Sequence, residues 1–180
     1  MENEQRPFQA SIKAGLITGL ILTVITFICY FIDYRTLGAG WLGFVTLAIY
    51  CGLIIYFGIQ YRKELGGFMN FGTGFQFSFF SLLIMLVVTT LGNMLLFFVV
   101  DPGLGERMAD VGLENALDMM ENFGVGDISA DQMDEIEKGI LDGYTPSGML
   151  KGAGFMIVFY AILALILGAI IKKKDKSLDY

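Results

Sequence analysis

Three polar side chains that can take part in binding lie close together in an otherwise apolar segment. Thr89 and Thr90 precede Asn93 by about one helical turn, so a helix would place all three near one another. An amide and two hydroxyls can hydrogen-bond a neighbouring helix, an ion or a solute. We expect Asn93 to be an interhelical contact worth about 0.6–2 kcal/mol, and keep a ligand pathway as the alternative.

No residues are spaced as a catalytic, cofactor or metal centre. The sequence has no histidine, which removes imidazole-ligated zinc, haem and histidine-based triads. Cys29 and Cys51 lie in apolar segments at depths about 10 Å apart, too far for a disulfide. A calcium loop starting at Asp127 fails, because Gln132 and Lys138 occupy its required glycine and glutamate positions. We predict no enzyme, no cofactor and no metal.

Four long segments that lack charged side chains surround these residues. A helix of about 20 apolar residues crosses the roughly 30 Å hydrocarbon core of a bilayer. The apolar centres of the four segments predict membrane spans at about residues 14–32, 41–60, 75–100 and 152–171. Overall composition agrees, since 55% of residues are hydrophobic and only 17% are charged, below the roughly 25% that is usual in soluble domains.

The third uncharged run, 65–100, is too long for a single span, because as one helix it would measure about 54 Å. Glycine weakens a helix by about 1 kcal/mol relative to alanine. Gly66, Gly67, Gly72 and Gly74 therefore predict a break, with the span beginning after them at about residue 75.

Charge is distributed unevenly and predicts the orientation. Twelve of the 18 acidic residues lie in 101–150 against two basic ones, so this loop has a net charge of −10, compared with −6 for the whole chain. Lysine and arginine concentrate in cytoplasmic loops. The side holding both termini carries Arg6, Lys13, Arg62, Lys63, Lys172, Lys173, Lys174 and Lys176, and the other side carries Arg35, Arg107, Lys138 and Lys151. Both termini are therefore predicted to be cytoplasmic and the acidic loop outside, and nothing indicates nucleic-acid binding.

The acidic loop is predicted to form two amphipathic helices. In its first half apolar residues recur at spacings of three and four, while Asp110, Glu114 and Asp118 repeat every fourth residue. Ser129 and Gln132 form a capping box that opens the second helix. The apolar faces have four alternative partners: each other, the spans, the lipid surface or another protein.

These patterns predict an all-α protein with a single membrane domain, residues 1–180. It is an integral membrane bundle of four transmembrane helices with an extracytoplasmic acidic helical hairpin between helices 3 and 4. Gly15 with Gly19, and Ala164 with Gly168, have the small-residue spacing that permits close helix packing. We interpret both pairs as packing within one chain, and a homo-oligomer is the alternative.

Several features together resemble a known family. They are the glycine- and aromatic-rich segment 62–75, Asp101 with Pro102 after the third span, the acidic helical loop, and the lysines that follow the last span. The chain resembles, over nearly its whole length, bacterial membrane proteins with four transmembrane helices that are catalogued as a domain of unknown function. The resemblance implies the same topology and a bacterial membrane location, and no chemistry.

The function expected from the sequence is that of an accessory or interaction protein of the bacterial inner (cytoplasmic) membrane. Besides the lipid bilayer, its expected partner is another membrane or periplasmic protein bound through the outer loop. The alternative is a subunit of an oligomeric transporter or channel for a small solute or ion, with Asn93, Thr89 and Thr90 lining the path. Transport coupled to ions by one copy is disfavoured, because the predicted spans hold no charged residue.

Overall fold

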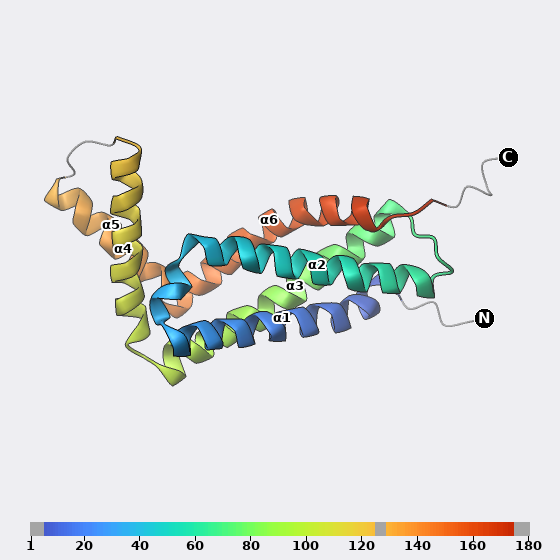
Figure 1. Ribbon diagram of the computed structural model, residues 1–180, viewed down its shortest axis with the longest axis horizontal. Coiled ribbons are helices and arrows are strands. Elements are labelled where there is room, and N and C mark those ends of the chain that lie inside the picture. The colour runs from blue at the N-terminus through green and yellow to red at the C-terminus, as the bar shows by residue number, and fades with distance from the viewer. Residues whose placement is uncertain (1–5, 125–128, 175–180) are drawn as a thin grey trace.

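The computed structural model describes residues 6–124 and 129–174, and their regular elements are helical apart from one isolated bridge (Figure 1). In chain order the elements are α1 (Pro7–Ile32), a 3-10 turn η1 (Tyr34–Gly38), α2 (Gly40–Glu64), α3 (Phe71–Leu95), a π turn η2 (Leu96–Val100), α4 (Leu104–Asn122), α5 (Ala130–Gly143) and α6 (Pro146–Ile171). Helices α1, α2, α3 with η2, and α6 are each long and apolar enough to cross a membrane. The predicted all-α class, with four candidate spans and two helices between the third and fourth, is confirmed.

The four long helices run side by side, and the remaining two helices lie at one end of the bundle (Figure 1). The beginning of α1 and the end of α6 are at the opposite end from α4 and α5. Helix α4 stands nearly perpendicular to the long axis of the bundle, so it lies across the ends of the spans. We call the α4 end of the bundle the outer end, following the predicted orientation.

The helices extend further than the spans predicted from the uncharged segments. Helix α1 starts at Pro7 and α6 at Pro146, each with proline in the first turn, where its missing N–H costs nothing. Lys13 and Lys151 therefore lie within helices. Long basic side chains near a helix end can reach the membrane surface while their stems stay in apolar surroundings.

The predicted break before the third span is only partly right. Gly66 and Gly67 have positive φ angles of 82° and 91° and form the elbow after α2. Gly72 and Gly74, however, are helical, because α3 already starts at Phe71. The Asn70 side chain caps α3 by accepting a hydrogen bond of 2.8 Å from the Thr73 N–H. A cap of this kind contributes about 1 kcal/mol and offsets the weak helix propensity of one glycine.

The elbow is tied to the end of α6. Met69 and Lys173 form an antiparallel bridge with two backbone hydrogen bonds of 2.9 Å. Arg62 donates a hydrogen bond of 2.7 Å to the Ile171 carbonyl, which is one of the unpaired carbonyls at the α6 C-terminus. Arg62 and Lys173, at the end of the bundle that holds the termini, therefore also join the elbow after α2 to the end of α6.

Helix α3 is the centre of the bundle, and small residues let its neighbours approach. A Cβ atom on Gly15 of α1 would lie 2.7 Å from the Ser81 carbonyl oxygen of α3. A Cβ atom on Gly168 of α6 would lie 2.7 Å from the backbone nitrogen of Phe75. The predicted packing of these small-residue segments within one chain is confirmed.

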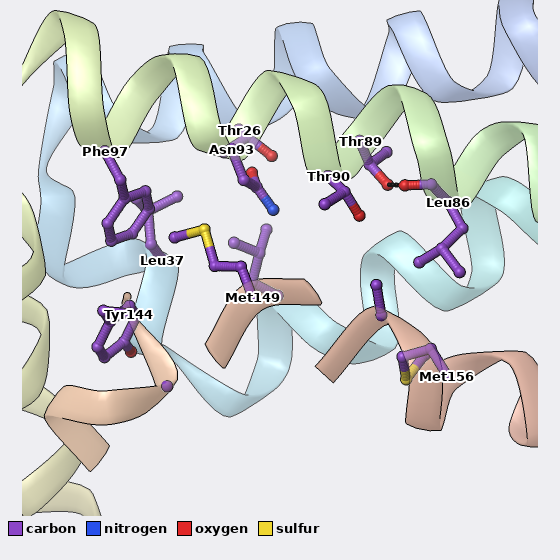
Figure 2. Close-up of a pocket in the computed structure, with 13 residues that line it drawn as sticks. Thr26, Leu37, Leu86, Thr89, Thr90, Asn93, Phe97, Tyr144, Met149 and Met156 are labelled. Atoms are coloured by element: carbon purple, nitrogen blue, oxygen red, sulfur yellow. Dashed lines mark hydrogen bonds between the residues drawn. The ribbon is translucent and has the colours of Figure 1, made fainter. Parts of the chain in front are cut away.

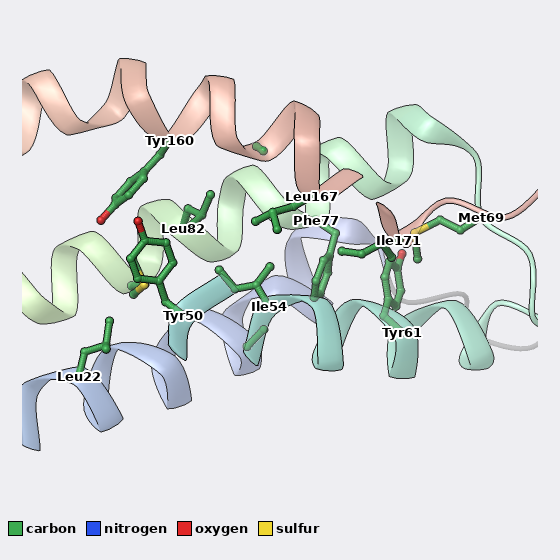
Figure 3. Close-up of a cluster of buried hydrophobic side chains, with 13 residues drawn as sticks. Leu22, Tyr50, Ile54, Tyr61, Met69, Phe77, Leu82, Tyr160, Leu167 and Ile171 are labelled. Carbon is green, nitrogen blue, oxygen red and sulfur yellow. The ribbon is translucent and has the colours of Figure 1, made fainter. Parts of the chain in front are cut away.

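Apolar side chains fill the half of the bundle toward the termini (Figure 3). Tyr50 of α2 meets Tyr160 of α6 edge to face, with ring centroids 6.0 Å apart. Ile54 and Leu82 are completely buried, and Leu167 is 2% exposed. This region is a packed core, and the cavity described below lies in the other half.

The predicted orientation can be tested at the outer end. Cys29 and Cys51 are unpaired, as predicted, so replacing them with alanine removes no disulfide. In that background a cysteine at Asn122, the exposed last residue of α4, should react with an impermeant thiol reagent added to intact spheroplasts. Labelling that requires disruption of the inner membrane would reverse the orientation.

Candidate functional site

A cavity of about 400 Å³ lies in the outer half of the bundle (Figure 2). Helix α3 with η2 forms one wall and α6 the opposite wall, while α1, α2, η1 and the end of α5 complete the lining. The lining residues are Thr26, Leu37, Leu42, Leu86, Thr89, Thr90, Asn93, Phe97, Gly143, Tyr144, Met149, Ala153 and Met156. All three polar candidates from the sequence therefore meet at this one cavity.

The four polar residues of the spans that line the cavity differ in their hydrogen bonds. Thr89 donates to the Met85 carbonyl at 3.0 Å, and Thr26 donates to the Leu22 carbonyl at 3.0 Å, so both hydroxyls are paired within their own helices. Thr90 and Asn93 point into the cavity (Figure 2).

The predicted hydrogen bond from Asn93 to a neighbouring helix is not formed. Within residues 6–124 and 129–174, neither the Asn93 amide nor the Thr90 hydroxyl has a hydrogen-bond partner in the structure. The reason is that the opposite wall of the cavity presents Met149 and Met156, whose thioethers are poor acceptors (Figure 2). Both side chains are half-buried, and a hydrogen-bonding guest in the cavity would give them the partner that the opposite wall does not supply.

An aromatic pair closes the outer end of the cavity. Phe97 of the π turn stacks on Tyr144, which follows α5, with centroids 5.4 Å apart and ring planes at 7°. Burial raises the pKa of Tyr144, so this phenol stays protonated at neutral pH. The cavity lining therefore carries no charge. The π turn that ends the third span begins at Leu96, three residues after Asn93.

The cavity presents a few hydrogen-bonding groups within an apolar lining. Its lining offers one amide, three threonine hydroxyls and one phenol, among aliphatic, methionine and aromatic side chains. Across the described part of the chain, no three histidine, cysteine, aspartate or glutamate side chains are grouped to hold a metal ion. The calcium loop rejected from the sequence includes residues outside the described ranges.

A second polar cluster, which we call the Asp101 cluster, joins α4 to the bundle. It consists of Asp101, Tyr30, Arg107 and Tyr34. The Tyr30 hydroxyl donates to Asp101 Oδ2 at 2.8 Å, and Arg107 pairs with the same oxygen. The Arg107 guanidinium also lies 5.1 Å from the centre of the Tyr34 ring, within the range of a cation–π contact.

The hydrogen bond from Tyr30 and the pairing with Arg107 hold the pKa of Asp101 below its usual value. The Asp101 side chain is only 17% exposed, so solvent screens these contacts partially. Sequence reasoning missed this cluster, because it treated Asp101 and Arg107 as loop charges. At the end of the π turn the Asp101 N–H donates a hydrogen bond of 2.9 Å to the Leu96 carbonyl. This bond fixes the backbone of Asp101 and therefore the position of its carboxylate.

Further contacts hold α4 on the bundle from its start to Asn115. Leu104 and Met108 are buried at the outer ends of the spans. Asn115 donates a hydrogen bond of 3.1 Å to the Gly38 carbonyl of η1. Arg35 and Glu114 lie 3.7 Å apart, but both side chains are 61% exposed, so this ion pair contributes little.

The apolar faces of α4 and α5 pack against each other. Ile140 of α5 lies so close to Gly112 of α4 that a Cβ atom there would be 2.8 Å from its Cγ2 atom. Ile136 is half-buried on the same face of α5. The predicted capping box of α5 is confirmed, with Ser129 and Gln132 each bonded to the other's backbone. Of the partners left open by the sequence, the two helices use each other and the ends of the spans.

This packing predicts different effects for two substitutions in the hairpin. Replacing half-buried Ile136 with aspartate places a charge in the α4–α5 contact and should open the hairpin, at a cost of about 1–3 kcal/mol. Replacing exposed Glu114 with glutamine should change little. Limited proteolysis of spheroplasts measures the difference, and equal cleavage of both variants would contradict the packing.

Four long apolar helices and an uncharged cavity at membrane depth define a multi-pass membrane protein. The chain belongs to the family described as "Protein of unknown function (DUF4199)", whose family model matches residues 13–173. No curated protein and no solved structure shows a significant match to this chain. The family resemblance seen in the sequence is thus confirmed.

Proposed function

We propose that this chain is an accessory protein of the bacterial inner membrane that binds a second protein outside the membrane through α4 and α5. The observation that carries the proposal is the placement of these helices. The first half of α4 is fixed to the bundle by the Asp101 cluster and by buried Leu104 and Met108, while the second half and most of α5 extend beyond it (Figure 1). A rigid base and a projecting pair of helices suit a docking element.

The projecting part combines acidic charge with exposed apolar side chains. Asp110, Glu114 and Asp118 lie on the exposed side of α4. Met119 and Phe123, near the end of the same helix, are 59% and 79% exposed. Methionine and aromatic residues inside a charged rim are typical of protein interfaces, and a net charge of −10 in residues 101–150 favours a partner with a basic surface.

Charge also supports the proposed cellular location. Eight lysine and arginine residues belong to the side of the termini and four to the side of α4, and α1 begins where α6 ends (Figure 1). The positive-inside rule then assigns the termini to the cytoplasm and the hairpin to the periplasm.

The proposal is tested by photo-crosslinking in intact cells. A photoreactive amino acid at Phe123 should give a discrete adduct with another protein, and one at Phe155, an 80% exposed residue of the fourth span, should give lipid adducts only. Neutralising Asp110, Glu114 and Asp118 together with amides should reduce the adduct at Phe123, because it removes the charge complementarity. Adducts of Phe123 with lipid alone, or with a second copy of this chain, would overturn the proposal.

A subunit of an oligomeric transporter or channel is the second candidate function, and the grouping of Asn93, Thr89 and Thr90 at one cavity favours it. Below the cavity, however, Tyr50, Tyr160 and Leu82 fill the bundle, so a path through one copy would require these side chains to move. Reconstituted vesicles that release a small solute only with the intact protein, together with a uniform oligomer in mild detergent, would favour this candidate over the first.

A further inference from the structure

We infer that the cavity between α3 and α6 binds the uncharged, carbonyl-bearing end of a lipid-soluble molecule. This inference concerns a site remote from the exposed tip of the hairpin and does not depend on the proposed partner protein. It rests on three properties of the cavity: unpaired hydrogen-bond donors, absence of charge and an apolar wall.

The donors are the Asn93 amide and the Thr90 hydroxyl. Both point into the cavity and neither has a hydrogen-bond partner within the described ranges (Figure 2). Asn93 lies seven residues before Val100, the end of the third span, which places it about 10 Å inside the helix end. A carbonyl oxygen of a guest can accept from both donors, and a membrane supplies few competing water molecules at this depth.

The lack of charge decides which part of a molecule can enter. None of the thirteen lining residues is acidic or basic, so a phosphate or a carboxylate would have no counter-charge there, and neither would an amine. An ester, ketone or quinone carbonyl has no such requirement. The guest end is therefore neutral, and it needs at least one hydrogen-bond acceptor to pair with the donors of Asn93 and Thr90.

The remaining walls suit an apolar guest. Met149 and Met156 face α3 across the cavity, and the Phe97–Tyr144 stack closes its outer end (Figure 2). Methionine side chains adapt to irregular apolar shapes. A volume of about 400 Å³ is near the lower limit of ligand pockets, so it holds a ring or a glyceride end, and a long tail has to remain in the bilayer.

Two kinds of membrane molecule share this chemistry, an isoprenoid quinone and a neutral glyceride. The experiment therefore uses two probes, menaquinone with a short prenyl chain and dioctanoylglycerol, each radiolabelled. The full chain is placed in phosphatidylcholine nanodiscs, and probe retention is measured against the mole fraction of probe in the lipid. The probe whose retention saturates at the lower mole fraction shows whether a quinone or a glyceride supplies the carbonyl.

Substitutions of cavity residues should weaken binding of the retained probe, whereas substitutions elsewhere should not. Asn93→Leu and Thr90→Val each remove one donor and should weaken binding about tenfold, as expected for the loss of one hydrogen bond in apolar surroundings. Ala153→Phe fills the cavity and should abolish saturable retention. The matched controls, Asn122→Leu on exposed α4 and Thr46→Val on α2 outside the cavity, should bind as the wild type does.

Thermal unfolding of each variant separates loss of the site from loss of the fold. Because Thr90→Val is close in shape to the natural residue, it keeps the test valid even where Asn93→Leu or Ala153→Phe does not fold. Saturable binding of either probe that these variants weaken supports the inference. Binding of neither probe, binding that Thr90→Val and the other folded variants leave unchanged, or equal competition by anionic phosphatidylglycerol would overturn it.

Discussion

Adding a single methyl group at Gly168 should destabilise the bundle strongly. The Cβ atom of Gly168→Ala would lie 2.7 Å from the Phe75 nitrogen and 2.9 Å from the Phe75 Cα atom, both in the backbone of α3. A side chain could rotate away, but a helix backbone has to shift as a whole, and α6 must then separate from α3. We expect a loss of about 1–3 kcal/mol in the free energy of unfolding and a lower unfolding temperature in detergent.

The same helix offers a matched control. Gly152 of α6 has no atom within 4 Å of the position that a Cβ would take. Gly152→Ala should therefore leave stability unchanged, or raise it by up to about 1 kcal/mol because alanine has the better helix propensity. Equal stability of the two alanine variants would show that α3 and α6 do not cross as closely as the structure places them.

The four spans could be predicted from the sequence because they depend on one property, the length of the uncharged apolar segments. The ends of the helices depend on local contacts as well, and there the prediction was less accurate. Gly72 and Gly74 were expected to interrupt the third helix, but the Asn70 cap starts it earlier and Gly74 is needed where α3 crosses α6. The low helix propensity of glycine was a valid argument that tertiary packing overrode.

The candidate site was predicted in its residues but not in its form. The sequence placed Asn93 with Thr89 and Thr90 on one helix, and all three line the same cavity. It could not show that two methionines would face them, since Met149 and Met156 lie on a helix more than fifty residues further along the chain. For this reason the hydrogen bond expected between Asn93 and a neighbouring helix is not formed among the described residues.

The Asp101 cluster was not foreseen because its members are far apart in the sequence. Tyr30 and Asp101 are separated by 71 residues, and they meet only because the first and third spans run parallel and both end at the outer end of the bundle (Figure 1). A signal was nevertheless present, namely an aspartate directly after a span with an arginine on the helix that follows. Such a pair at a membrane surface can be a structural contact as well as a loop charge.

Removing the Asp101 carboxylate should release the start of α4 from the bundle. Asp101→Ala removes the acceptor shared by Tyr30 and Arg107 and leaves the guanidinium with only its contact to the Tyr34 ring. Trypsin cleaves after arginine only where the backbone can leave its helix. We therefore expect cleavage after Arg107 in spheroplasts to become at least severalfold faster.

Two comparisons make this result specific. Cleavage after Lys138, on exposed α5, should not change in Asp101→Ala, and Asp110→Ala, which removes an exposed carboxylate from the same part of the chain, should not accelerate cleavage after Arg107. If Asp101→Ala and Asp110→Ala behaved alike, general loss of negative charge would explain the effect and the cluster would not anchor α4.

The pKa of Asp101 sets the pH range in which this anchor holds. Its folded pKa lies below the ordinary value of 3.8, so the carboxylate stabilises the folded state at any pH above that value, and the contribution is lost as the pH falls through the lower, folded pKa. Hydrogen exchange of the first turn of α4, corrected for the intrinsic effect of pH, should therefore be constant from about pH 5 to 8. Protection should decrease only in more acidic solution, and in Asp101→Asn, which has no charge to titrate, this acid-dependent decrease should be absent. A decrease already near pH 6 would mean that another group controls the attachment of α4.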